Sequence, residues 1–164
     1  MSGIVGIDLP EAEVHRLIVA YVNEYTAAEN AARTAAGGSL RSVPGQRQPW
    51  QPEWPRELTP AWAASVDADD GDGLRWYTLL DGPRLGGVFV SQNILIDLSQ
   101  CEGMSTAAPV PADLVSVEVE PLCVTDGGAR SEFILSLEEA REHTRGMIAA
   151  GKLMASLLEP AGGE

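Results

Sequence analysis

The side chains best suited to chemistry are few in this chain. It contains two histidines, His15 and His143, and two cysteines, Cys101 and Cys123. A structural metal site needs about four converging ligands and a catalytic one about three, usually with two of them close in sequence. Neither histidine has such a neighbour, so the sequence predicts no metal site and no cofactor.

A cysteine nucleophile needs a base that forms its thiolate. Nothing in the sequence brings Cys101 or Cys123 close to a histidine. We expect Cys123, which follows a strand of alternating valines, to be a small buried side chain, and Cys101 to lie in an exposed loop. Two such cysteines do not form a disulfide framework, which indicates a reducing cytoplasm.

An acidic segment in the middle of the chain could hold calcium. Its aspartates alternate with alanine and glycine: Asp67, Asp69, Asp70 and Asp72. An EF-hand loop begins with aspartate, has glycine at its sixth position and ends with glutamate. With Gly71 or Gly73 at the sixth position, Val66 or Ala68 would come first, so the EF-hand interpretation fails. A solvated acidic turn is favoured over an irregular calcium site.

The charge balance limits the class of partner. The chain has 24 acidic and 11 basic residues and a net charge of −13. Nucleic-acid binding depends on lysine and arginine, so we expect no nucleic-acid partner. We expect instead a protein partner with a basic surface. The residues expected to bind it are the four aspartates of the acidic segment, Glu118, Glu120, Trp50 and Trp54.

Two long helices are expected at the ends of the chain. The first spans 9–36, starts after a capping Asp8 and keeps one stripe: Val14, Ile18, Tyr21, Tyr25, Ala28, Ala32 and Ala35. The second spans 137–158 and begins at a capping box formed by Ser136 and Glu139. Its stripe comprises Leu137, Ala140, Thr144, Met147, Gly151, Met154 and Leu158.

These stripes repeat every seven residues, which favours packing along a neighbouring helix. Either the two helices pair or they form a dimer. We expect a homodimer in which Tyr25, Ala28 and Ala32 of the first helix form a two-fold contact.

The segment between the helices contains two regions of different composition. Residues 38–62 are rich in proline and tryptophan, which indicates an extended segment wrapped over the core. Strands are then expected at 74–80, 85–90, 93–98, 115–120 and 132–135 within a meander over 74–135. A hairpin turn is expected around Gly82, Gly86 and Gly87.

These elements predict one α+β domain over residues 1–164. An antiparallel sheet of four to five strands carries the C-terminal helix, with the long N-terminal helix packed beside it. No apolar stretch approaches the ~20 residues of a spanning helix, and the N-terminus lacks a signal-peptide pattern, so no membrane or export role is expected.

The order of motifs resembles a family of short uncharacterised actinobacterial proteins over about residues 60–158. The resemblance rests on Pro60-Ala61-Trp62, the acidic segment, Gly82-Pro83, paired strands and Ser136–Arg141 opening the last helix. In that family Cys and then His typically follow the tryptophan, whereas Ala63 follows it here. A metal role is therefore not implied for this chain.

The sequence thus favours a non-catalytic interaction or regulatory protein over an enzyme. The alternative is a small enzyme or ligand-binding domain whose tryptophans, Trp50, Trp54, Trp62 or Trp76, line a pocket. No residue constellation in the sequence identifies a catalytic site.

Overall fold

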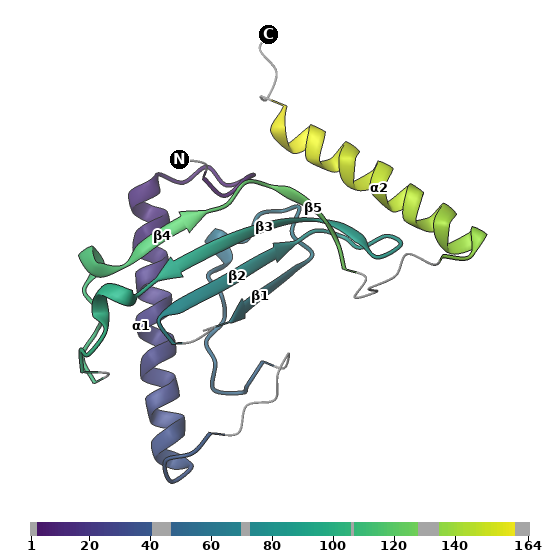
Figure 1. The fold of residues 1–164 in the computed structure, drawn as a ribbon. Helices are drawn as coiled ribbons and strands as arrows, with labels where there is room; N and C mark the ends of the chain where they lie inside the picture. Colours follow the sequence, from purple (N-terminus) through teal and green to yellow (C-terminus); the bar gives the residue numbers. More distant parts are fainter. Residues whose placement is uncertain (1–2, 41–46, 70–72, 106, 128–134, 160–164) are drawn as a thin grey trace.

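The computed structural model describes residues 3–40, 47–69, 73–105, 107–127 and 135–159 (Figure 1). It confirms the α+β class, with a helix at each end and a five-stranded antiparallel sheet between them. The elements are α1 (Glu11–Ala35), β1 (Ser65–Asp69), β2 (Arg75–Asp81), β3 (Val88–Asp97), β4 (Ser116–Val119), β5 (Cys123–Asp126) and α2 (Leu137–Leu158). Short 3-10 helices are η1 (Arg56–Leu58), η2 (Ser99–Cys101) and η3 (Ala112–Leu114).

The sheet is organised around β3. The strand order is β1-β2-β3-β4, and β5 also pairs with β3. The second half of β3 pairs with β4 and its first half with β5, so these two short strands follow one another along the same edge of β3. The two strands expected at 85–90 and 93–98 are one continuous strand, which is a correction to the predicted meander.

Two further strand predictions need correction. β1 covers part of the segment that was interpreted as an acidic turn, because residues 65–69 pair with β2 along their whole length. β5 was not predicted. The expected strand at 132–135 falls, except for Leu135, outside the described residues.

One face of the sheet, here called the inner face, carries the core. In β2 it comprises Trp76, Thr78 and Leu80, and the register places these opposite Ile96, Ile94 and Gln92 of β3. All six are buried. Because side chains alternate along a strand, Val90 and Val88 share this face.

Both helices lie on the inner face. Tyr21 and Tyr25 of α1 make edge-on ring contacts with Trp76. α2 lies at the other end of β3, where Gly146 contacts Val88. Figure 1 shows α1 crossing the sheet steeply and α2 near the β2–β3 turn. The opposite face, here called the outer face, is not covered by either helix.

The start of α1 differs from the prediction. The helix begins at Glu11 with Pro10 at the N-cap position, and no side chain caps it. Asp8 therefore does not cap the helix. The buried stripe is confirmed in its first half, where Val14, Ile18 and Tyr21 are all core residues.

The dimer contact expected on α1 is wrong at Tyr25, which is only 3% exposed. Trp50 packs against its ring at a centroid distance of 5.2 Å, and Gln51 donates a hydrogen bond to its hydroxyl at 2.9 Å. Ala28 and Ala32 are half-buried. The stripe of α1 up to Tyr25 is thus part of the chain's own core.

A buried glutamine fixes the N-terminal segment to the inner face. Oε1 of Gln92 accepts a hydrogen bond from the Val5 amide at 2.9 Å, and Nε2 donates to the Glu120 carbonyl at 3.0 Å. Trp62 donates from its indole to the Val5 carbonyl at 2.7 Å. The segment around Val5 therefore covers the sheet where α1 and α2 leave it open.

The capping box that opens α2 is confirmed. The Ser136 hydroxyl accepts from the Glu139 amide, and the Glu139 carboxylate accepts from the Ser136 amide at 2.8 Å. α2 docks through Gly146 and Ala150, which are buried, against β3 and β5. Of the predicted stripe, Leu137, Met147 and Leu158 are exposed, whereas Met154 packs against the core.

Candidate functional site

Three of the acidic residues expected to bind a partner, Asp67, Glu118 and Glu120, lie on the outer face, and the backbone of Asp69 is in register with them. The strand register forms two rows of residues across the sheet. One row runs Asp69, Tyr77, Leu95, Glu118. The other runs Asp67, Leu79, Asn93, and continues to Glu120, whose amide donates to the Asn93 carbonyl at 2.9 Å. Each row therefore has an acidic residue at both ends.

The centre of these rows is apolar and open. Tyr77 is 41% and Leu79 is 39% exposed, while Leu95 is half-buried. Neighbouring strands lie about 4.8 Å apart, so the backbones of β1 and β4 are separated by about 14 Å. This surface, here called the acidic trough, is an apolar strip that covers β2 and β3. The acidic residues of the two rows lie on either side of it.

The trough ends where the outer face becomes covered. Towards the β2–β3 turn, Phe89 and Ser91 are buried. The Arg84 guanidinium lies 4.3 Å from the centre of the Phe89 ring, and Ser91 donates to the Asp81 carboxylate at 2.9 Å. These contacts cover the outer face of β3 at Phe89 and Ser91, so the trough is confined to the part of the face around Tyr77.

Asn93 is the polar group at the centre of the trough. Its Nδ2 donates to the Glu120 carboxylate at 3.1 Å, which orients that carboxylate over the face. Its Oδ1 is buried and accepts no hydrogen bond from the described residues. Buried polar atoms are rarely left unpaired, so Asn93 is the least satisfied polar side chain of this surface.

The remaining predicted partner-binding residues lie elsewhere. Asp70 and Asp72 fall outside the described residues. Trp50 and Trp54 are half-buried and pack on Tyr25 and Tyr21. These ring contacts agree with the expectation that the proline- and tryptophan-rich segment wraps over the core.

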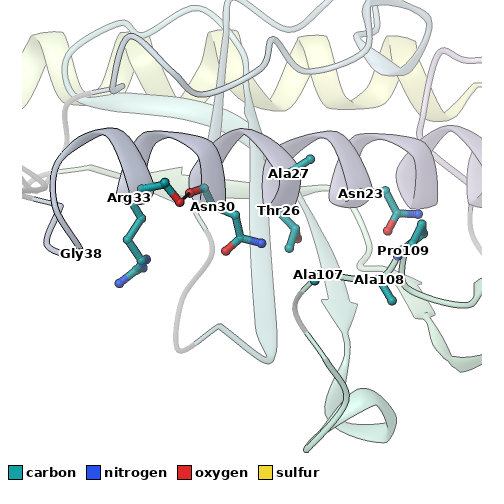
Figure 2. Close-up of a pocket in the computed structure, with 10 residues that line it drawn as sticks. Asn23, Thr26, Ala27, Asn30, Arg33, Gly38, Ala107, Ala108 and Pro109 are labelled. Carbon is teal, nitrogen blue, oxygen red and sulfur yellow. Dashed lines mark hydrogen bonds between the residues drawn. The ribbon is translucent and has the colours of Figure 1, made fainter.

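A hollow of about 520 Å³ lies between α1 and the loop that precedes η3 (Figure 2). It is lined by Asn23, Thr26, Ala27, Asn30, Arg33, Thr34, Gly38, Ala107, Ala108 and Pro109. Asn23 ties the loop to the helix by accepting from the Val110 amide at 2.7 Å. Thr26 and Thr34 donate to carbonyls of their own helix. None of the tryptophans is among the lining residues.

The two histidines lie in different parts of the fold. His15 contacts the Val115 carbonyl at 2.9 Å, and His143 lies 4.0 Å from the Asp126 carboxylate. Among the described residues, no three side chains of the metal-binding types gather into a metal site.

The environment of one thiol differs from the expected one. Cys123 is exposed, so its predicted burial was wrong, and Cys101 is half-buried. Cys123 follows β4 but begins a new strand whose side chain at that position lies on the outer face, opposite Ser91. Burial raises the pKa of the Cys101 thiol and the nearby Asp113 carboxylate adds to the effect, which disfavours the reactive thiolate.

Sequence reasoning missed the apolar centre of the trough. Tyr77 and Leu79 alternate with buried Trp76, Thr78 and Leu80, a pattern of a strand with apolar residues on both faces. A one-sided sheet was expected, so the outward tyrosine and leucine received no role. The signal present in the sequence was the alternation of these two residues with the core residues, which indicates a strand with apolar side chains on both faces.

Comparison with protein-family models, curated proteins and solved structures finds no match for this chain. Within the described residues, no helix is both long and apolar enough to cross a membrane.

Proposed function

We propose that this chain is a non-catalytic interaction protein of the reducing cytoplasm, and that its acidic trough binds a basic surface of a partner protein. The observation that supports the proposal is the pair of cross-strand rows. The rows place Asp67 at one margin and Glu118 and Glu120 at the other margin of an exposed apolar strip around Tyr77 and Leu79. No other described surface combines these two features with the residues that the charge pattern singles out.

The two parts of the trough have different roles in binding. Burial of Tyr77 and Leu79 supplies affinity, because desolvated aromatic and apolar groups dominate interface energetics. The flanking carboxylates attract and orient a basic partner, which mainly raises the association rate. The complex should therefore weaken as salt rises.

The proposal is tested by affinity capture from cells of the source organism with matched charge variants. Asp67→Lys/Glu118→Lys reverses both margins of the trough. Glu24→Lys/Glu102→Lys makes the same charge change at exposed sites on α1 and after η2. We expect wild type and the second variant to retain the same protein at low salt, and the first variant to lose it.

The expected loss is about tenfold or more in association rate for the trough variant. Equal loss in both double variants would show that net charge alone drives binding, and equal retention in both would show that the trough is not the binding surface. Either result would refute the proposal. Circular dichroism of each variant establishes that the fold is intact.

A further inference from the structure

Exposed apolar side chains gather on a second surface, independent of the acidic trough. Among the described residues, eight large apolar side chains are exposed, and four of these lie on α2. They are Leu137, Met147, Ile148 and Leu158, with exposed fractions of 70%, 46%, 54% and 55%. α2 packs on the core through buried Gly146 and Ala150 and through partly buried Leu153, Met154 and Leu157. The four exposed side chains are not part of the core cluster.

These side chains form one stripe along α2. Leu137, Thr144, Gly151 and Leu158 recur every seven residues, and Ala140, Met147, Ile148 and Ala155 lie beside them at helical spacing. The stripe, here called the outer stripe, lies on the side of the helix away from Gly146 and Ala150. A stripe with a seven-residue repeat is the surface that one helix offers to another.

The outer stripe is complementary to itself when it is read backwards. Leu137 then meets Leu158, and Met147 meets Ile148, so large residues face large ones. Ala140 meets Ala155, and Thr144 meets Gly151, so small residues face small ones. This match places a two-fold axis between Met147 and Ile148 and overlaps the two helices along their whole length of about 33 Å.

We propose that α2 is the interface of a homodimer, in which the outer stripe of one chain packs antiparallel against the outer stripe of a second copy. A two-fold contact uses the same surface on both partners, which a stripe with this internal symmetry satisfies. The small residues permit close approach, and the central Met147 and Ile148 supply apolar area at the axis. The dimer interface thus lies on the last helix and not on α1.

Charge gives this dimer a distinctive dependence on salt. Each copy carries a net charge of −13, so two copies repel one another at low ionic strength. On α2 itself, Arg141, Arg145 and Lys152 lie along one flank of the outer stripe, and the two-fold axis brings the same flanks together. Salt screens both repulsions and strengthens the dimer, whereas it weakens a complex formed at the acidic trough.

The test measures self-association by analytical ultracentrifugation from low to high micromolar concentration. Met147→Glu is compared with Met104→Glu, because the two methionines are similarly exposed at 46% and 44% but only Met147 lies on α2. We expect the dissociation constant of the dimer to rise about tenfold or more in Met147→Glu and to stay unchanged in Met104→Glu. A monomeric wild type, or equal effects of the two substitutions, would overturn the proposal.

The antiparallel orientation of the two α2 helices is tested by disulfide cross-linking in a chain that carries Cys101→Ser and Cys123→Ser. The two-fold axis brings position 147 of each copy together, so Met147→Cys should form a covalent dimer. Leu158→Cys should not, because the two positions lie at opposite ends of the antiparallel pair. Cross-linking at both 147 and 158 would show a parallel arrangement, and cross-linking at neither would show that the outer stripe is not the interface; either result would contradict the proposal. Neither result bears on the acidic trough, so the two proposals can fail separately.

Discussion

Gly146 of α2 lies directly against the carbonyl group of Leu85 in the β2–β3 turn. A Cβ atom at position 146 would come within 2.1 Å of that carbonyl oxygen, and one at Gly86 would come within 2.5 Å of the Glu142 carbonyl oxygen. Helix and turn therefore meet backbone to backbone. This contact explains how a helix with few buried side chains is held on the sheet.

Gly146→Ala should lower the free energy of unfolding. The added methyl group displaces α2 from the turn at a cost of about 1–3 kcal/mol, larger than the gain in helix propensity. Gly151→Ala is the matched control in the same helix, because nothing lies within 4 Å of a Cβ at that position. It should stabilise the chain by about 0.5–1 kcal/mol. Urea titration of dilute protein measures both, and equal effects would show that the close approach is absent.

Gln92→Leu should destabilise the chain by about 1–3 kcal/mol. The substitution leaves the Val5 amide and the Glu120 carbonyl without the hydrogen bonds that the buried side chain now makes. Gln100→Leu, at an exposed position of η2, should change stability by less than about 0.5 kcal/mol. Hydrogen exchange at the Val5 amide provides the second readout, and unchanged protection there in Gln92→Leu would contradict this role.

Tyr25→Glu should unfold the chain and should not yield a folded monomer. The ring is buried between Trp50 and Trp76, at centroid distances of 5.2 and 4.6 Å, where a carboxylate has no partner. Ala31→Glu, on the exposed side of α1, should leave the thermal unfolding curve almost unchanged. If the wild type is dimeric and Tyr25→Glu is a folded monomer, that result would support the dimer contact predicted on α1 and contradict its burial in the core.

Asp97 should contribute to the loss of stability in acid. The hydrogen bonds from the Ser99 hydroxyl and amide, the latter at 2.8 Å, hold the pKa of Asp97 below its ordinary value of 3.8. A carboxyl group with a lowered pKa in the folded chain stabilises it above that ordinary value and ceases to do so as the pH falls below it. The difference in stability between wild type and Asp97→Asn should therefore shrink between neutral pH and pH values below 3.8. A difference independent of pH would contradict this assignment.

The sequence predicted the fold class because its strongest signals are local. The capping box at Ser136 and the glycine turn around Gly86 each depend on residues close in the chain, and both are present. The side of α2 that docks on the sheet was missed because its fully buried residues are Gly146 and Ala150, while Leu153 and Leu157 are only partly buried. Small residues permit backbone contact but contribute little hydropathy, so the larger side chains on the opposite side dominated the pattern.

The acidic trough was predicted only in part for a related reason. The excess of acid identified Asp67 and Glu118, but their shared surface depends on the register of four strands. That register pairs residues that are far apart in the sequence, and a single sequence does not reveal which residues pair. The apolar residues between the acids, Tyr77 and Leu79, acquire a role only once β1 and β4 are known to flank them.

The most direct test of the acidic trough is photo-cross-linking from its centre in cells of the source organism. A benzophenone side chain replaces Tyr77, and Met104, similarly exposed but outside the trough, carries the same group in the control. We predict that position 77 cross-links a partner protein, that Asp67→Lys/Glu118→Lys in the same chain abolishes the product, and that position 104 gives none. A partner captured from position 104 and not from 77, or a product at 77 that survives the charge reversal, would contradict the account.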